Sequence, residues 1–459
     1  MKIDLHQAIA VVVTVILGIT LGSAQTVKEV VSFTGNNSLG NPGGILSQAR
    51  NGELYGTCPN PKDTFGSIFG LAPDGNLASL YTFGSQGGFD PRASLTLATD
   101  GNLYGTAVGG GTGDNGVLFR VSSKGVYTVL HNFMADSDGA GPEAAPIEGS
   151  DGNLYGTTSG EAGIFASTVY KYTPAGSFTT LYEFGNVQAE SISTALIEGS
   201  DGNLYGTSPK GGAFGYGSIF KVSKDGTLLY NYSFPGFQSG AFPYGPLVQA
   251  SNGFYYGTTY LGGSAAGYGT IFKMDSKGTV SIVYSFAAQS DGANPYGGLI
   301  QATDGNLYGT TSAAGTYGYG TIFRISTTGR FKALYSFSSA IGETPSAAPM
   351  QHTSGMFYGS LPFGSKFGYG AIYSLDMGLG PFVAFVLPTG KTGQTAQILG
   401  QGFTGTTSVV FHGVPAKSFK VESDTYMTAV IPSGATTGSV VVTTPSGKLT
   451  SNQAFRITK

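Results

Sequence analysis

The residues with the clearest potential for chemistry form a column of polar side chains that recurs along the chain. The column stands seven residues before a repeated tyrosine, and Leu97 occupies it in one copy. Its polar members are Gln48, Glu148, Glu198, Gln249, Gln301 and Gln351. If they ring a central channel, Glu148 and Glu198 are neighbours, and carboxylates held close together raise a pKa or recruit a cation. The alternative, which we favour, is a hydrated channel in which water satisfies each group.

A second column is aromatic and stands four residues before the end of each GYGTIF-like string. Its members are Phe65, Tyr216, Tyr268, Tyr319 and Tyr369, and the other two copies have Asn115 and Ala166. Tyr244 and Tyr296, each after a proline, extend the same surface. A tyrosine combines a flat apolar face with a hydroxyl, so these six tyrosines are candidates for stacking on a sugar or peptide. The alternative, which we favour, is that each ring fills a seam between copies, because large aromatic side chains are usually buried.

The remaining reactive residues do not form a recognisable catalytic or metal site. His131, His352 and His412 fall in different copies or in the C-terminal region, without a shared ligand spacing. Copper-radical propeller oxidases need Cys, Tyr and His together, whereas Cys58 replaces a threonine of the repeat and reads as a small buried residue. We therefore predict no cofactor and no metal.

The recurring aspartates have a structural interpretation. Asp100, Asp151, Asp201 and Asp304 precede glycine in tight turns where Asn and Ser also occur, which is typical of turn formers. Asp136-Ser137-Asp138-Gly139 hints at calcium but lacks the later ligands of an EF-hand loop. Calcium is therefore only a weak candidate.

Charge and the N-terminal segment indicate where the protein acts. Lys and Arg total 23 against 26 Asp and Glu, a net charge of −3 that argues against a nucleic-acid partner. The apolar run Ala8–Leu21 precedes Gly22-Ser23-Ala24, the pattern of a cleaved signal peptide over residues 1–24. The alternative is an uncleaved anchor, although about 20 apolar residues are needed to span a bilayer. We expect a secreted or cell-surface protein, exported in the bacterial manner, with no membrane span after cleavage.

These columns belong to seven copies of a unit of about 50 residues. Its tyrosines are Tyr55, Tyr104, Tyr155, Tyr205, Tyr256, Tyr308 and Tyr358. One copy predicts four strands, a to d: 298–302, 307–311, 321–325 and 332–337, with Asp-Gly or Thr-Gly turns between a and b and between c and d. Four antiparallel strands per copy are typical of a propeller blade. The last copy lacks strand d, and residues 27–33 have the pattern of the missing strand. We therefore predict an all-β, seven-bladed β-propeller over residues 25–378 that is closed by its N-terminal strand.

Residues 381–459 predict a small β-sandwich. Strand-forming runs at 408–411, 427–431 and 440–443 alternate with turns such as Thr389-Gly390, Ser433-Gly434 and Ser446-Gly447. The stretch Gly400-Gln401-Gly402-Phe403 through Val409–Ala416 resembles IPT/TIG immunoglobulin-like domains, as do Ile431–Ala435 and Val441–Gly447. The resemblance implies an immunoglobulin-like fold for the C-terminal region.

The repeat itself, with its NLYGT, GYGTIF and LYSF strings, resembles the GloVer tandem repeat of choice-of-anchor proteins over residues 27–376. The resemblance implies an exported bacterial surface protein and no particular biochemical activity.

Together these features favour a non-catalytic extracellular or cell-surface protein that binds a glycan or another protein. The long b–c and d–a loops share one face, and binding residues concentrate on long loops held by a rigid scaffold. The alternative is a secreted polysaccharide-active enzyme, a lyase or hydrolase on the same scaffold. Such an enzyme should break the repeat symmetry with clustered His, Arg, Glu or Tyr in a cleft, and the sequence predicts no such break.

Overall fold

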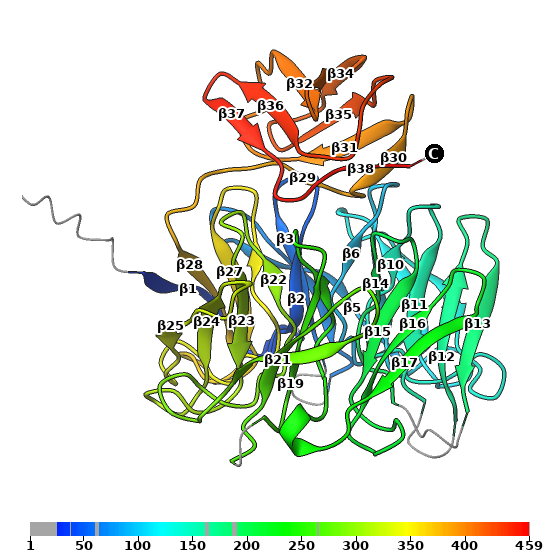
Figure 1. The fold of residues 1–459 in the computed structure, drawn as a ribbon, viewed down its shortest axis with the longest axis vertical. Helices are drawn as coiled ribbons and strands as arrows, with labels where there is room; N and C mark the ends of the chain where they lie inside the picture. The colour runs from blue at the N-terminus through cyan, green and yellow to red at the C-terminus, as the bar shows by residue number, and fades with distance from the viewer. Residues whose placement is uncertain are drawn as a thin grey trace, which may run out of the picture.

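The computed structural model describes residues 25–36, 38–59, 64–160, 165–185, 191–263 and 266–458, so the expected signal segment 1–24 lies outside it. The described chain is almost entirely β-structure (Figure 1). Its helical elements are two short 3₁₀ turns, η2 at Ser85–Gly87 and η3 at Phe237–Ser239. No helix of the described chain has the length and apolar character needed to cross a membrane.

The repeats form seven four-stranded antiparallel sheets, in the order a-b-c-d. Sheet 1 contains β2 (Gly43–Gln48), β3 (Leu54–Cys58), β4 (Ser67–Leu71) and β5 (Leu77–Thr82). Sheet 2 contains β6 (Thr96–Leu97), β7 (Leu103–Ala107), β8 (Val117–Val121) and β9 (Tyr127–Asn132). Sheet 3 contains β10 (Ile147–Glu148), β11 (Leu154–Thr158), β12 (Ser167–Tyr172) and β13 (Phe178–Phe184). Sheet 4 contains β14 (Ile197–Glu198), β15 (Leu204–Ser208), β16 (Ser218–Val222) and β17 (Leu228–Ser233).

The same order continues in the later repeats. Sheet 5 contains β18 (Val248–Gln249), β19 (Tyr255–Thr259), β20 (Thr270–Met274) and β21 (Val280–Ser285). Sheet 6 contains β22 (Ile300–Gln301), β23 (Leu307–Thr311), β24 (Thr321–Ile325) and β25 (Phe331–Ser336). Sheet 7 contains β26 (Met350–Gln351), β27 (Phe357–Leu361), β28 (Ala371–Asp376) and, as its fourth strand, β1 (Thr26–Ser32).

Turn chemistry explains why each copy folds in this way. The glycines of the seven a–b turns have φ between +76° and +95°, a region that a residue with a Cβ rarely adopts. Strands b and c of sheet 6 coincide with the residues expected from the sequence. Strand a is shorter than expected, with only Ile300–Gln301 paired. Gly298, just before it, packs closely on sheet 5, where a Cβ on this glycine would lie 2.5 Å from the Pro246 carbonyl oxygen. A Cβ on Gly245 would lie 2.3 Å from the Gly298 nitrogen.

The first strand of the sequence pairs with the last strand of the repeat region. β1 runs antiparallel to β28, with Thr26 opposite Asp376 and Val27 opposite Leu375. Phe33, which follows β1, is fully buried and contacts the edge of Phe69 in sheet 1, at 5.3 Å between ring centroids. The expected pairing of residues 27–33 with the last copy is therefore present.

A hydroxyl on strand b links each sheet to the next. In every copy this hydroxyl donates to a backbone carbonyl at the start of the following repeat, at distances of 2.8–3.1 Å. The pairs are Thr57–Ala93, Thr106–Ala144, Thr157–Thr194, Thr207–Gly245, Thr258–Gly297, Thr310–Ala347 and Ser360–Gly44. The seventh bond runs from sheet 7 to sheet 1. This recurring bond explains why a threonine, or a serine in the last copy, follows the glycine of strand b in every repeat.

The C-terminal region contains two further four-stranded sheets and one parallel pair. The first sheet contains β29 (Ala384–Phe385), β31 (Thr395–Leu399), β35 (Tyr426–Val430) and β34 (Ser418–Val421). The second contains β33 (Val414–Pro415), β32 (Ser408–Phe411), β36 (Val440–Thr444) and β37 (Gly447–Thr450). β30 (Thr389–Lys391) pairs with β38 (Arg456–Thr458). Ile398 and Met427 from the first sheet share one buried core with Phe411 and Val442 from the second.

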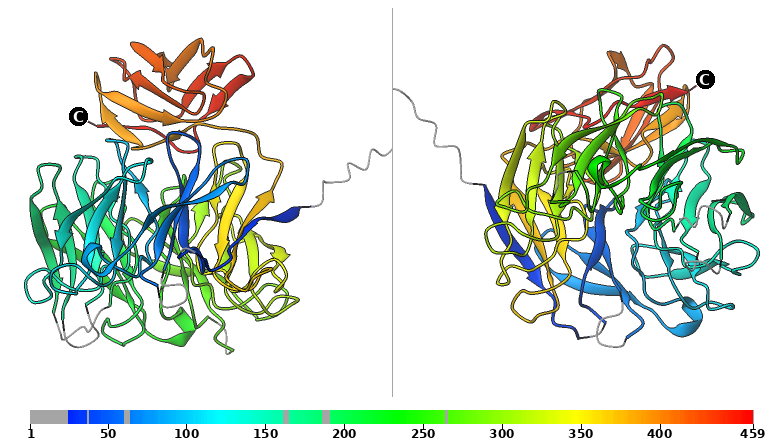
Figure 2. Two further views of the ribbon diagram at one scale, coloured as in Figure 1. Left: turned by 180° about the vertical axis from the view of Figure 1, so that it is seen from behind. Right: turned by 60° about the horizontal axis from the view of Figure 1, so that its bottom comes forward.

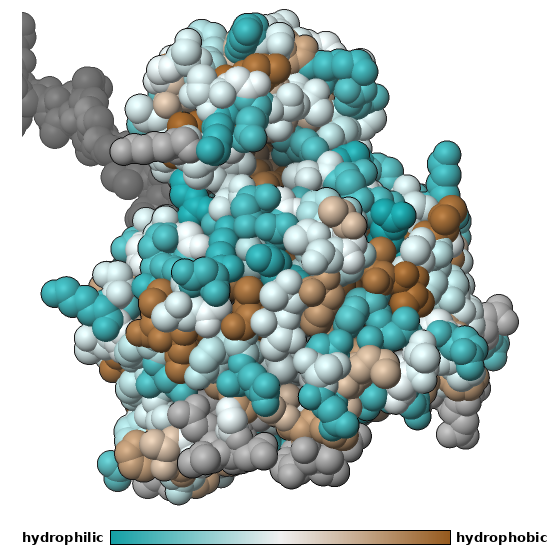
Figure 3. All heavy atoms as spheres, turned by 90° about the vertical axis from the view of Figure 1, so that its right-hand side faces the viewer, coloured by the Kyte–Doolittle hydropathy of each residue, from teal (hydrophilic) through white to brown (hydrophobic). Residues whose placement is uncertain are grey.

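The C-terminal sheets lie over the a–b turns of the repeat region, whereas the long loops project from the opposite end (Figures 1 and 2). In the side view of Figure 3, apolar atoms form separate small groups among polar ones. The two ends of the repeat region therefore offer different surfaces: one is partly covered by this chain's own C-terminal sheets, and the other is open.

Candidate functional site

The polar column expected to line a channel joins neighbouring sheets. Each polar side chain accepts the backbone N–H of the residue two positions after the column in the preceding sheet, at 2.7–3.0 Å. The pairs are Gln48–Thr353, Glu148–Thr99, Glu198–Ser150, Gln249–Ser200, Gln301–Ser251 and Gln351–Thr303. Each glutamine also donates to the hydroxyl of the same Ser or Thr. Protein groups thus take up at least one hydrogen-bonding position of each polar side chain, and the hydration of the channel stays an untested prediction.

The interface between sheets 1 and 2 departs from this pattern, and residues at this interface contact the C-terminal region. Leu97 has no polar group to offer, and Arg50 replaces the Ser or Thr of its partner position. Arg50 instead donates to the Thr99 carbonyl at 2.6 Å and to Gln397 Oε1 at 2.7 Å. Its guanidinium also lies over the Tyr426 ring.

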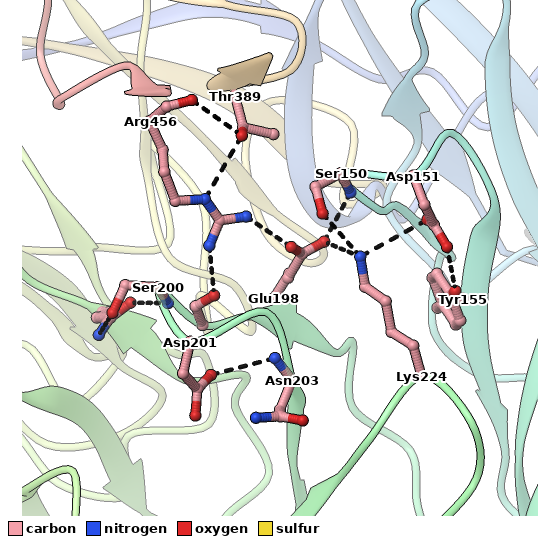
Figure 4. A network of polar contacts seen from close by, with 12 residues as sticks. Ser150, Asp151, Tyr155, Glu198, Ser200, Asp201, Asn203, Lys224, Thr389 and Arg456 are labelled. Carbon is pink, nitrogen blue, oxygen red and sulfur yellow. Dashed lines mark hydrogen bonds and ion pairs between the residues drawn. The ribbon is translucent and has the colours of Figure 1, made fainter. Parts of the chain in front are cut away.

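The two glutamates have separate sets of partners. Arg456 Nη2 and Lys224 Nζ lie 2.6 Å and 2.8 Å from the Glu198 carboxylate (Figure 4). Burial disfavours its charged form, but hydrogen bonds from Lys224 and Ser150 outweigh this effect and lower its pKa. Glu148 has hydrogen bonds from Thr99, and burial raises its pKa. A cation between them stays an untested prediction.

The turn aspartates hold the repeat tyrosines. The carboxylates of Asp100, Asp151, Asp201 and Asp304 accept the hydroxyl of the tyrosine four residues later, at 2.7–2.9 Å. Asp201 also pairs with Lys221 at 2.8 Å. This arrangement agrees with their interpretation as turn formers.

The described residues contain no group of three His, Cys, Asp or Glu side chains placed to hold a metal. His131 hydrogen-bonds to Asp138 at 2.6 Å, and Asp138 also accepts the Met134 N–H, so one of the two carboxylates of the calcium-like segment has protein partners. His352 hydrogen-bonds to the Gly52 carbonyl in the seam between sheets 7 and 1. Cys58 is fully buried, which raises the pKa of its thiol to about 12.

Four side chains of three chemical kinds meet at the open end of the repeat region. A cavity of about 130 Å³ is lined by residues from all seven repeats, three to five positions before the polar column, with repeat 1 contributing Gly44 and Ile45. At that fifth position stand Gly43, Arg92, Glu143, Ser193, Tyr244, Tyr296 and Ser346. We call this the central cavity. Apart from the glycine and two serines, its rim combines a cation, a carboxylate and two phenols.

The rim of the central cavity has a polar and an aromatic half. Arg92 binds Asp90 at 2.7 Å and lies 3.8 Å from Glu143. Tyr244 and Tyr296 are stacked, with ring centroids 4.7 Å apart and an interplanar angle of 12°. Tyr260 contacts both rings edge-on. Burial raises the pKa of Glu143 and of both stacked tyrosines.

The expectation that the repeat contains no symmetry break of this kind is wrong. The structure brings Arg92, Glu143, Tyr244 and Tyr296 together at one cavity. Sequence reasoning found the two tyrosines and missed Arg92 and Glu143. The signal was available, because all four follow a proline at the same position of the repeat.

The other four candidate tyrosines occupy the b–c loops. Their backbone carbonyls accept an N–H from the next repeat: Tyr216 from Phe242, Tyr268 from Asn294, Tyr319 from Thr344 and Tyr369 from Asn41. Their rings differ in surroundings: Tyr216 contacts Phe237, and a Cβ on Gly35 would meet the Tyr369 ring. The Tyr268 and Tyr319 rings remain 36% exposed. The backbone forms the seam, and exposed ring surface remains in sheets 5 and 6.

Sequence comparison identifies the repeat. The model of the Gloeobacter/Verrucomicrobia repeat matches residues 15–166, 136–302 and 262–407, together more than half of the chain. The chain belongs to this family, as the GloVer resemblance predicts. No curated protein matches the sequence significantly.

Solved structures show a likeness in fold. A fungal alcohol oxidase of the AA5 family, in complex with copper, shares 13% identity and a TM-score of 0.51, over 90% of this chain and 96% of that one. A gluconolactonase from Xanthomonas campestris shares 12% identity, with a TM-score of 0.42 over 77% and 89% of the two chains. A putative 6-phosphogluconolactonase from Bacteroides fragilis shares 17% identity, with a TM-score of 0.45 over 66% and 85%. At these identities the likeness concerns the fold alone.

Proposed function

We propose that this protein is a non-catalytic binding protein, secreted or held at the cell surface, that binds a glycan on its long-loop face. The central cavity is the centre of the site, and Tyr244 and Tyr296 provide its stacking surface. The observation that carries the proposal is the pair of stacked rings beside the Arg92–Glu143 pair, at a cavity to which every repeat contributes. Aromatic faces suit sugar rings, and the charged pair offers donors and acceptors for hydroxyls.

The proposed architecture is a closed seven-bladed β-propeller over residues 25–378, followed by an IPT/TIG immunoglobulin-like domain over residues 381–459. Three observations support closure: the pairing of β1 with β28, the Ser360–Gly44 hydrogen bond and the Gln48–Thr353 pair. The shared core of two C-terminal sheets supports a sandwich. A cleaved signal peptide over residues 1–24 is part of the same proposal.

One observation favours a second candidate function, a secreted polysaccharide lyase or hydrolase. Glu143 is a carboxyl whose pKa is raised by burial, and it lines the central cavity, to which all seven repeats contribute. A carboxylic acid kept protonated can act as a general acid in glycoside hydrolysis. The Asp90 carboxylate, a second acidic group that acts on Glu143, is held by Arg92 at 2.7 Å.

Screening the mature protein against soluble oligosaccharides, insoluble polysaccharides and peptides tests the binding proposal. For any ligand found, Tyr244→Ala and Tyr296→Ala should each weaken affinity by about tenfold, the effect of one lost aromatic contact and its buried area. Tyr127→Phe, in strand d of sheet 2, is a control for a tyrosine change away from the cavity; it removes one hydroxyl, which donates to the Gly87 carbonyl. Unchanged affinity in both cavity variants would place the site elsewhere. Release of new reducing ends or unsaturated products, lost in Glu143→Gln, would establish the enzyme instead.

A further inference from the structure

The long-loop face carries exposed aromatic side chains well beyond the central cavity. They lie on the b–c and d–a loops, mainly of sheets 4 to 7, and are between 36% and 61% exposed. We call this set the aromatic rim. Its members are Phe65, Phe214, Phe237, Tyr268, Tyr317, Tyr319, Phe363 and Phe367. Phe214, Tyr317 and Phe367 share one position, two residues before the aromatic column.

The loops that carry the rim are held in place by their backbones. The Asn294 N–H bonds the Tyr268 carbonyl at 2.8 Å, and the Thr344 N–H bonds the Tyr319 carbonyl at 3.1 Å. Asn294 and Thr344 have φ of 57° and 56°, the left-handed conformation, immediately before a proline. Because the next sheet holds each carbonyl, the exposed rings are presented on a fixed backbone. A preorganised surface loses less conformational entropy when it binds.

The ground between the rings is almost free of charge. The b–c loops at 209–217, 260–269, 312–320 and 362–370 contain Lys210 and Lys366 as their only charged residues, and are otherwise rich in Gly, Ser and Ala. The d–a loops at 287–296 and 338–346 contain Asp291 and Glu343. The Asp291 carboxylate already accepts the Tyr284 hydroxyl and the Ala287 and Gln289 N–H groups. The rim therefore lacks the basic footprint that an anionic polymer or an anionic membrane requires.

We propose that the aromatic rim docks an extended, uncharged polysaccharide, with the central cavity receiving one part of the same chain. This inference rests on the proposed function and names its substrate class. Isolated rings on neutral, hydroxyl-bearing ground suit a polymer whose sugar rings offer a CH face at regular intervals and keep their hydroxyls in water. A protein partner would favour a continuous apolar patch with arginine among its aromatics. Rings spread over several loops, with two each on the b–c loops of sheets 6 and 7, match repeated sugar units better.

The test uses two sets of variants of the mature protein and two kinds of probe. The rim set is Tyr268→Ala, Tyr317→Ala, Tyr319→Ala and Phe367→Ala combined, and the control set is Leu229→Ala with Ile282→Ala, which are exposed on the outer strands β17 and β21. The probes are insoluble cellulose, xylan, mannan and chitin, and short soluble oligosaccharides of the same sugars. Circular dichroism and the melting temperature establish that each variant is folded.

The expected result is that the rim set lowers partition onto a neutral insoluble polysaccharide by about tenfold or more. The affinity for a soluble oligosaccharide should stay within about twofold of the wild type, since the central cavity is intact. The control set should change neither measurement. Partition of the folded rim set equal to that of the wild type would overturn the proposal, and so would equal competition by polygalacturonate.

Two further outcomes distinguish this docking proposal from the proposed function on which it rests. A wild-type protein that binds a soluble oligosaccharide but no insoluble polysaccharide would refute the docking surface and leave the cavity site standing. A wild-type protein that binds neither would refute both. Sedimentation that shows a dimer in the wild type and a monomer in the rim set would assign the rim to a second copy of this chain instead.

Discussion

The guanidinium of Arg50 lies over the ring of Tyr426, with 4.7 Å between the Arg50 Cζ and the ring centroid. The first repeat thus contacts the C-terminal region through two residues that are 376 positions apart in the sequence. The contact stands where the polar column fails, because Leu97 cannot hold the neighbouring turn as the glutamines do. The interface between sheets 1 and 2, which lacks the polar-column hydrogen bond, is therefore the place where Arg50 connects the repeat region to the C-terminal region.

This joint leads to a first prediction. In Arg50→Ser with Leu97→Gln, a glutamine–serine pair like Gln249–Ser200 replaces the Arg50 contacts with Gln397 and Tyr426. We expect the repeat region to keep its melting temperature and the segment 377–383 to be cleaved faster by protease, because the C-terminal sheets are held less firmly. Arg330→Ser, an exposed turn position, is the control. Equal cleavage rates of the double variant and the wild type would contradict the prediction.

The strand-b hydroxyls supply a second prediction. Thr258→Val keeps the shape of the side chain but removes the donor to the Gly297 carbonyl, leaving that buried acceptor unpaired. The expected loss is about 1–3 kcal/mol in the free energy of unfolding, measured by urea denaturation. The same change at Thr112, an exposed loop residue, should alter it by less than about 0.5 kcal/mol. Equal effects at both sites would show that the bonds between sheets contribute nothing.

A third prediction concerns the N-terminal strand. Removing residues 26–33 deletes β1 and the buried Phe33, so β28 becomes an unpaired edge. We expect a large fall in melting temperature or aggregation of the truncated protein. The shorter deletion of residue 25 alone should have no effect. Unchanged melting without β1 would refute the closed propeller.

A fourth prediction follows from the pH dependence of His352. Its pKa is lowered, mainly by burial, below the ordinary value of 6.5, so the unfolded chain binds more protons than the folded one between these two values. Stability from this residue is therefore complete above about pH 6.5 and falls as the pH drops toward the folded pKa. His352→Ala, which restores the residue found in several other repeats, should flatten the dependence of melting temperature on pH in that range. An equally steep dependence in the variant would exclude His352 as its source.

The sequence predicted the strands better than the contacts between them. The glycine of each a–b turn reveals its positive φ directly, and residues 307–311 and 321–325 became β23 and β24 without a shift. The hydrogen bonds from the polar column could not be predicted, because they depend on how far Gln301 reaches across to Ser251, 50 residues away. Arg92 and Glu143 were missed for a different reason: the residue after this proline differs from one repeat to the next, so the position does not stand out as a column, although the shared proline marks it and the structure places it at one cavity.

The closing contacts also impose an order on folding. Gln48 and Thr353 are 305 residues apart, and Ser360 and Gly44 are 316 apart, so neither pair can form until nearly the whole repeat region has been made. At about 5–20 residues per second, the 351 residues from Thr26 to Asp376 take roughly 20–70 s to synthesise. Contacts so distant in sequence also slow folding itself. During this interval β1 has no partner, so its unpaired edge is available to other chains until β28 has been made.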